Sequence, residues 1–356
     1  MAFSKGMIFV IVLIYGGLTY LTWSILKIKD QQFTKKNLLL PLYVTGPLLF
    51  LYIFLGLISQ ATYTFMYYIL GSLLAYIIYV VIFCGIHQII SHFTKKVPTI
   101  ARYILIMGVP AIIWLIGTIC ANVITYDEHT LHYEGFNGKF KIAHLSDIHL
   151  GVLYKKNFIQ SIVDEINNIK PDIVVITGDL FDSSMKVEVD WLKPFDTLTI
   201  PIFYITGNHE TYYNKTEALE IIKQTNIQYI TNVYDVNNRI NLIPVDYEYR
   251  NLTDRLTTLS HLYKDSKIPN VLLCHVPLLK PKDLAPFNIF LYLGGHSHGG
   301  QMFPMHLISY FGSKCFAGLY SDDNNHYVYV STGLGAVLCP IRLLAASVIG
   351  IINIEG

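Results

Sequence analysis

Five short polar motifs, each placed after an apolar run, contain residue types that bind divalent metal ions. In chain order the motifs are Asp147-Ile148-His149, Gly178-Asp179, Gly207-Asn208-His209-Glu210, His275 and Gly295-His296-Ser297-His298. Carboxylate, amide oxygen and neutral imidazole suit Mn, Fe, Zn or Ni better than a metal that prefers thiolate ligands. A single motif of this kind is more often a turn or a hydrogen-bonded histidine. Five of them in series predict a metal site.

The motifs favour a site with two ions. Asp147 and His149 lie two residues apart, so on an extended segment their side chains point to one side and can chelate one ion. The carboxylate of Asp179 has two oxygens and could bridge this ion to a second. Two ions about 3.5–4 Å apart hold the attacking and leaving oxygens of an in-line phosphoryl displacement, and they acidify a bound water. The expected chemistry is therefore phosphoester hydrolysis by a metal-bound hydroxide.

The elements that must position these motifs alternate along the chain. Short apolar runs predict buried strands at 173–176, 202–205, 271–274 and 289–293, and amphipathic stretches predict helices at 158–169, 217–225 and 252–263. The polar motifs follow the strands, at the edge where an open α/β sheet places its sites. An α/β domain is therefore expected over 139–356.

The complete series of motifs resembles the calcineurin-like metallophosphoesterases, whose pattern is D-x-H, G-D, G-N-H-[DE], H and G-H-x-H. The match runs from residue 141 to about 335, and the segments at 145–149, 294–301 and 331–335 resemble a membrane-anchored bacterial subgroup. The resemblance implies two mixed β-sheets packed face to face with helices outside. Pro340-Ile341-Arg342 also matches the subgroup, whereas Ala345-Ala346-Ser347 stands where the subgroup often has Pro-Glu.

The resemblance also implies a role for each matching residue. The ligands would be Asp147, His149 and His298 for the first ion, Asn208, His275 and His296 for the second, and Asp179 as the bridge. His209 matches the residue that protonates the leaving oxygen or steadies the phosphate. Asp182 matches the carboxylate that orients this histidine, with a structural role as the alternative. Two divalent ions are expected, manganese first, with iron, zinc or nickel as alternatives. Asp182-Ser183-Ser184 lacks the arginine of the protein Ser/Thr phosphatases, which disfavours that activity.

The N-terminal third has a different composition from the rest of the chain. Overall, 53% of the residues are hydrophobic and 14% are charged, against roughly 25% charged in soluble domains. Four apolar stretches, at 6–26, 38–58, 65–90 and 100–124, are each long enough to cross a bilayer. Their lack of a polar face argues against core helices of a soluble domain. A four-span membrane domain at 1–126 is therefore expected, with a linker at 127–138.

Basic residues in the short loops predict an orientation. They lie in the first and third loops, whereas the loop at 59–64 has none; they are Lys27, Lys29, Lys35, Lys36, Lys95, Lys96 and Arg102 at the edge of the fourth span. These two loops should face the cytoplasm. The catalytic domain would then lie on the extracytoplasmic side of the cell membrane. A mildly acidic α/β domain is not expected to bind nucleic acid.

The segment at 302–320 (MFPMHLISYFGSKCFAGLY) is unusually apolar for a loop beside a site. It predicts either a β-hairpin over the core or a lip that admits an acyl or prenyl chain, or touches the bilayer. The favoured function is a membrane-embedded phosphohydrolase of a phosphomonoester or phosphodiester, carried by a lipid or cell-envelope precursor, with membrane lipids as partners. The alternative is a membrane sensor or binding protein whose metal domain is regulatory. The few ionisable groups in the spans disfavour a transporter.

Overall fold

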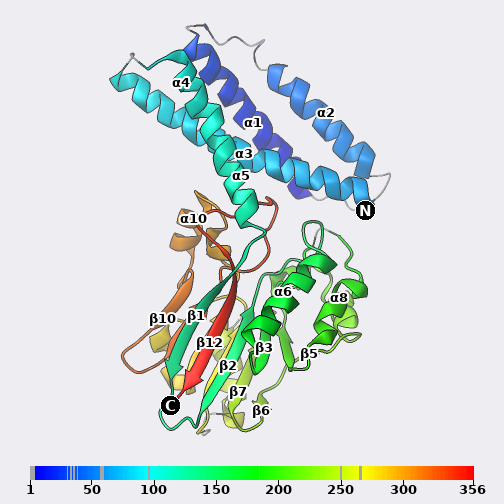
Figure 1. Cartoon of the computed structure of the whole chain (residues 1–356), viewed down its shortest axis with the longest axis vertical. Coiled ribbons are helices and arrows are strands. Elements are labelled where there is room, and N and C mark those ends of the chain that lie inside the picture. Colours follow the sequence, from blue (N-terminus) through cyan, green and yellow to red (C-terminus); the bar gives the residue numbers. More distant parts are fainter. Residues whose placement is uncertain are drawn as a thin grey trace. The chain divides into compact units, whose positions relative to one another are not determined.

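The computed structural model describes residues 5–29, 31–32, 34, 37, 39–56, 60–94, 97–183, 185–248, 251–263 and 267–356. The chain forms two compact units (Figure 1). One comprises residues 1–120 and 338–341, and the other comprises residues 121–337 and 342–356.

The first unit is helical. Its helices are α1 (Lys5–Ile28), α2 (Leu39–Gly56), α3 (Gln60–Phe93), α4 (Thr99–Tyr103), the π-helical turn Ile104–Gly108 and α5 (Val109–Cys120). Helices α1 and α3 pack closely because Gly17 has no side chain; a Cβ there would overlap Ile77. The same two helices are joined by a hydrogen bond of 2.7 Å from Gln88 Nε2 to the hydroxyl of Tyr20.

Two of the four predicted membrane spans have support from the structure. Over the described residues, Thr64–Phe93 and Thr99–Cys120 are long and apolar enough to cross a membrane, and Val12–Ile28 is a shorter apolar helix. The spans predicted at 6–26 and 38–58 fall in α1 and α2, and neither helix is among the two span candidates found over the described residues. The fourth predicted span is too long, because Ile124 already begins a β-strand.

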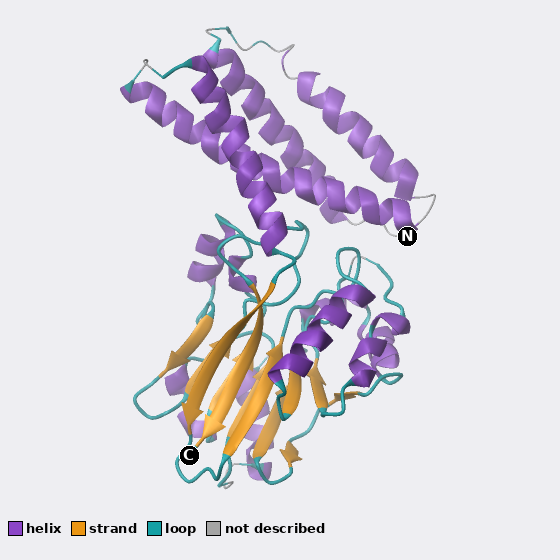
Figure 2. Cartoon of the chain, viewed as in Figure 1, coloured by secondary structure: helices purple, strands orange, loops and turns teal. Residues whose placement is uncertain are grey.

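The second unit contains two six-stranded sheets, which Figure 2 shows in orange. The first sheet has the order β1-β12-β2-β3-β4-β5 and the second β10-β11-β9-β8-β7-β6. The strands are β1 (Ile124–His132), β2 (Lys139–Leu145), β3 (Ile173–Thr177), β4 (Ile202–Ile205), β5 (Ile227–Tyr229), β6 (Tyr234–Val236), β7 (Ile240–Val245), β8 (Asn270–Cys274), β9 (Leu291–Gly294), β10 (Gly318–Ser321), β11 (Tyr327–Val330) and β12 (Ser347–Glu355). Both sheets are mixed: β2 to β5 run parallel beside the antiparallel β12, and β7, β8, β9 and β11 run parallel between antiparallel edges.

The sheets pack face to face, with helices on their outer faces. Side chains such as Val175 and Phe203 from the first sheet meet Val271 and Leu293 from the second in one buried cluster. The helices of this unit are α6 (Lys156–Ile169), α7 (Asn208–Tyr213), α8 (Lys215–Ile222), α9 (Leu252–Leu259) and α10 (Met305–Gly312). Helices α6 and α8 cover the outer face of the first sheet, and α9 covers that of the second. The predicted α/β architecture of two mixed sheets flanked by helices is confirmed.

Two local predictions are wrong. Residues 127–132 of the predicted linker belong to β1, which pairs with β12 from Ile124 opposite Ser347 to His132 opposite Glu355. As an edge strand, β1 has a largely exposed, polar surface and therefore gives no apolar run. The hairpin predicted at 302–320 begins instead with α10, because Pro304 stands at the helix N-cap and has no N–H to donate to a sheet. The hairpin of β10 and β11 starts only at Gly318.

Candidate metal centre

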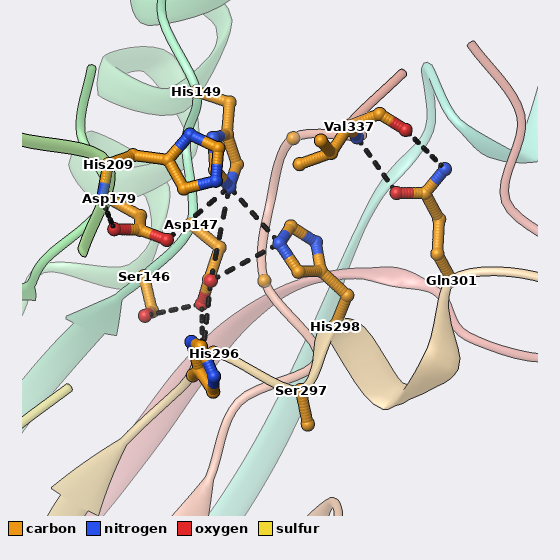
Figure 3. A network of polar contacts seen from close by, with 12 residues as sticks. Ser146, Asp147, His149, Asp179, His209, His296, Ser297, His298, Gln301 and Val337 are labelled. Atoms are coloured by element: carbon orange, nitrogen blue, oxygen red, sulfur yellow. Dashed lines mark hydrogen bonds and ion pairs between the residues drawn. The ribbon is translucent and has the colours of Figure 1, made fainter. Parts of the chain in front are cut away.

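The predicted site residues meet at the carboxyl ends of strands from both sheets. Three strands of the first sheet and two of the second end beside one another here. The donors that follow them are Asp147 and His149 after β2, Asp179 after β3, Asn208 after β4, His275 after β8, and His296 and His298 after β9. Figure 3 shows how closely several of these side chains approach one another. The structure therefore brings together all seven predicted ligands.

The first group of donors consists of Asp147, His149 and His298. The Nε2 atom of His298 lies 3.3 Å from Asp147 Oδ1 and 3.1 Å from His149 Nε2. One ligand atom of each residue lies within 4.8 Å of the other two. This grouping is the one that the family resemblance implies for the first ion.

The second group consists of Asp179, His275 and His296, joined by Asn208. The Nε2 atom of His275 lies 3.1 Å from Asp179 Oδ2, 3.1 Å from Asn208 Oδ1 and 3.3 Å from His296 Nδ1. Asp179 Oδ2 also lies 3.8 Å from Nε2 of His149 in the first group. One carboxylate oxygen therefore faces both groups, which is the place of a bridging ligand.

The donor set fits divalent cations. Ring nitrogens approach one another at 3.1 Å between His149 and His298 and at 3.3 Å between His275 and His296. Two neutral imidazoles whose lone pairs converge in this way need a proton or a cation between them. Oxygen and imidazole donors without thiolate suit Mn, Fe, Zn or Ni, and the donor types do not select one of them.

Burial and neighbouring charge act in opposite directions on the ionisable donors. Burial disfavours the charged form of His275, but Asp179 outweighs it and raises the pKa of His275 to about 10. Burial would likewise raise the pKa of Asp179, yet His275 and His149 hold that pKa well below its ordinary value. Burial lowers the pKa of His298 to about 3, so this imidazole is neutral at pH 7, the form that binds a metal. The Asp179 carboxylate therefore stabilises positive charge at this point of the site.

Left-handed backbone geometry orients the donors. Asp147, His149, Asp179, His296 and His298 have φ angles of 52°, 54°, 51°, 70° and 52°. Residues other than glycine avoid this region at a cost of about 1–2 kcal/mol each. The prediction that Asp147 and His149 share one side because the segment is extended is therefore wrong. Their side chains converge because the chain turns sharply at both positions after β2 ends. Such strain clusters at functional sites.

Glu210 supports the bridging position and was not predicted as a site residue. Its carboxylate is fully buried and accepts hydrogen bonds from the backbone N–H of Gly207 at 2.6 Å, Asp179 at 3.0 Å and Phe181 at 3.1 Å. Gly207 is required beside it, since a Cβ there would overlap Asp179 Oδ1. The acidic position of the G-N-H-E motif was the available sequence signal.

Arg342 is a second residue that was not predicted for the site. Its side chain is fully buried, and its guanidinium donates to the carbonyl oxygens of Gly335 at 3.0 Å, Thr332 at 2.8 Å and Ala346 at 3.1 Å. One of its nitrogens also lies 3.4 Å from Nδ1 of His298. Burial lowers the pKa of Arg342 to about 10, so it remains a cation at neutral pH. Arg342 therefore joins the segment 332–346 to the first group of donors.

His209 and Asp182 form the predicted pair beside the donors. Nδ1 of His209 lies 3.7 Å from Asp182 Oδ1, and the ring centroids of His209 and His149 are 4.5 Å apart. Burial lowers the pKa of His209, but Asp182 and Asp179 outweigh it and raise that pKa above its ordinary value. The backbone N–H of His209 donates to Asp179 Oδ1 at 2.8 Å, so the histidine is fixed to the Asp179 carboxylate.

Fold and site together define an α/β domain whose oxygen and imidazole donors fit divalent metal ions, with His209 beside them. Residues 140–300 match the family model for calcineurin-like phosphoesterases. Over these residues the chain is therefore similar to the calcineurin-like phosphoesterases.

Several known proteins resemble this chain. An uncharacterized metallophosphoesterase of Helicobacter pylori strain J99 is 32% identical over 64% of this chain and 63% of its own length. A Bos taurus transmembrane protein with metallophosphoesterase domain is 32% identical over 57% of this chain and 50% of its own length. The chain thus spans less than two thirds of these relatives. A solved dimetal phosphatase of Danio rerio has a TM-score of 0.38 at 9% identity, covering 55% of this chain and 87% of that one, which is too distant to bear on the activity.

Proposed function

We propose that this chain is a membrane-embedded phosphohydrolase that uses two divalent metal ions to cleave a phosphomonoester or phosphodiester. The observation that carries the proposal is the convergence of seven oxygen and imidazole donors, in two groups that Asp179 Oδ2 faces, within a segment that matches the calcineurin-like phosphoesterase model. When bound, the ions would supply positive charge for the phosphoryl oxygens and acidify a water.

The side chains of this domain would divide the work between holding ions and moving a proton. The first ion would be held by Asp147, His149 and His298, the second by Asn208, His275 and His296, and both by Asp179. His209, whose Nδ1 faces Asp182, would donate a proton from Nε2 to the leaving oxygen. Its raised pKa keeps a larger share of the imidazole protonated near neutral pH.

The test is metal content and ester hydrolysis by the full-length protein purified in detergent. We expect two ions per chain and turnover of p-nitrophenyl phosphate or its bis ester. The Asp179→Asn variant should lose turnover, since it removes the charge that faces both groups. Wild-type turnover by that variant would refute the two-ion mechanism. Two bound ions without turnover of these esters or of a lipid phosphoester would refute the hydrolase and favour a regulatory metal domain.

We further propose four membrane spans with the metallophosphoesterase domain on the extracytoplasmic side. Support comes from Thr64–Phe93 and Thr99–Cys120, from the apolar helices α1 and α2 at the other two positions, and from the lysines of the first and third loops. Reporter fusions after Gly356 in a bacterial host can test this. An active alkaline phosphatase and a dark green fluorescent protein are expected, and the opposite pair of results would refute this orientation.

A lipid or cell-envelope precursor is the substrate class that we propose for the domain. Membrane embedding supports this class, and the mildly acidic α/β part does not attract long polyanions. Turnover should therefore be higher for a phosphoester presented in vesicles than for soluble nucleotides. Equal or faster turnover of the nucleotides, in detergent and in vesicles alike, would refute it.

A further inference from the structure

Helix α10 presents apolar side chains to the outside of the α/β unit. Six large apolar residues are exposed within a stretch of nine, and no residue of the helix is buried. They are Phe303, Met305, Leu307, Ile308, Tyr310 and Phe311. Ile308 is 66% exposed and Phe311 is 82% exposed, and no charged residue occurs from 302 to 313. Apolar patches of this kind mark sites of interaction with a protein or a membrane.

The helix is attached directly to the loop that carries two predicted metal ligands. Gly300, two residues after His298, has a φ of 72°, and a Cβ there would lie 2.5 Å from His306 Cα in α10. On the other side of the helix, the hydroxyl of Ser297 donates to the carbonyl of Phe316 at 2.5 Å. Both ends of the segment that contains α10 therefore contact the loop that carries His296 and His298. The position of α10 and the position of the donors are coupled.

A short connection joins α5 to the strand that begins at this edge of the sheet. Three residues separate Cys120, the last residue of α5, from Ile124, the first of β1. Ile124 pairs with Ser347, and β12 runs antiparallel to β2, so β1 begins at the edge where β2 ends in Asp147. An extended link of four peptide steps spans about 14 Å at most. A link of at most about 14 Å therefore joins the span candidate Thr99–Cys120 to the strand that begins at the donor edge.

We propose that α10 is an interfacial helix whose apolar side chains enter the lipid bilayer at the level of the headgroups. Such helices lie in the membrane plane, with the apolar side chains about 5–10 Å deep. Because α10 is fixed to the donor loop, the metal centre would then face phosphate groups at the membrane surface. This substrate geometry rests on the proposed phosphohydrolase function, whereas the insertion of α10 does not. The substrate class is a phosphoester whose apolar chain stays in the bilayer during the reaction.

A fluorescent probe on α10 tests the insertion. Among the described cysteines, Cys120 is exposed and the other four are buried, so Cys120→Ser gives a background in which an introduced thiol is labelled selectively. Phe311→Cys carries an NBD dye, and Asn324→Cys, in the exposed turn between β10 and β11, is the matched control. The full chain is reconstituted in phosphatidylethanolamine–phosphatidylglycerol vesicles with a spin label near the top of the acyl chain.

We expect the spin label to quench the dye at position 311 at least threefold more strongly than the dye at position 324. Equal quenching at the two positions would overturn the proposal. A second result would also overturn the proposal. In that result the dye at position 311 has the same blue-shifted emission in detergent and in vesicles, and the lipid label does not quench it. That result would mean that protein, rather than lipid, covers the helix.

Turnover gives a second and separate measurement. Turnover is measured for a vesicle-borne phosphoester and for soluble bis(p-nitrophenyl) phosphate, and the first rate is divided by the second. Ile308→Asp should lower this ratio by about tenfold, because that factor corresponds to the free energy of burying one large apolar side chain. Ile308→Leu is the matched control and should leave the ratio unchanged. An unchanged ratio in Ile308→Asp would overturn the proposal. If neither ester is hydrolysed by the wild type, the proposed function fails, and the quenching experiment alone decides on the helix.

Discussion

Replacing Glu210 with Gln should weaken the metal centre without altering any of its predicted ligands. The buried carboxylate accepts three backbone hydrogen bonds, from Gly207 and Asp179 on one oxygen and from Phe181 on the other. A glutamine has only one acceptor oxygen, and its NH2 group must then face at least one N–H. An orphaned buried donor costs about 1–3 kcal/mol. Glu210→Ala orphans all three donors and should cost at least twice as much.

The three donors that this carboxylate holds include the backbone N–H of Asp179, so metal binding should suffer with stability. Loss of a group that orients a ligand lowers metal affinity by about 10–100-fold. Calorimetric titration with Mn²⁺ measures the affinity, and thermal unfolding with and without Mn²⁺ measures the stability of the full-length protein in detergent. Burial and the charge of Asp179 raise the pKa of Glu210. If Glu210 were protonated, glutamine would replace it at little cost. Wild-type affinity and unfolding temperature in Glu210→Gln would therefore refute the assignment of an ionised carboxylate.

Three other measurements test neighbouring parts of the structure. Asp182→Asn should move the basic limb of the pH–rate profile to lower pH, because the carboxylate helps to raise the pKa of His209; an unmoved limb would contradict their pairing. Arg342→Lys should lower Mn²⁺ affinity by about tenfold, because an ammonium group cannot span the carbonyl groups that the guanidinium joins; calorimetry showing wild-type affinity would contradict this role. At pH 7 in detergent a maleimide should label Cys120 and leave Cys274 unreacted, because burial raises the pKa of Cys274 to about 11. Labelling of Cys274 should increase only as the pH approaches that value, and rapid labelling at pH 7 would show that this thiol is not buried.

The elements that could be predicted from the sequence are those whose burial leaves a simple pattern. Strands β3 and β8 are buried at every position and read as unbroken apolar runs. Helix α6 repeats its apolar residues with the helical period, so its inner face is visible in the sequence. Strand β1 has one buried residue, Leu131, and its partner lies far away in the chain. No local pattern could therefore distinguish this strand from a linker.

The donor residues of the candidate site could be predicted from the sequence, whereas the backbone geometry that orients them could not. The donors follow the strand ends in the order of the metallophosphoesterase motifs. Their convergence could therefore be predicted from the sheet topology. The left-handed conformation of residues such as Asp147 depends on the turn that the fold imposes. It cannot be predicted from the residue type, because aspartate and histidine usually adopt other backbone conformations. Glu210 and Arg342 were missed for a related reason. Their partners are backbone groups, which every residue carries, so only the folded chain shows which groups they bind.

The position of β12 has a consequence for how the protein is made. This strand lies between β1 and β2, and among the described strands it is the one neighbour of β1 in the first sheet. Ribosomes add about 5–20 residues per second, so β1 waits roughly 10–45 s for its partner to be synthesised. Until then the edges of β1 and β2 have unpaired N–H and C=O groups, which invite aggregation and proteolysis. A prematurely terminated chain that lacks 347–355 could not complete this sheet. Completion of the first sheet therefore depends on a strand that is translated long after its neighbours β1 and β2.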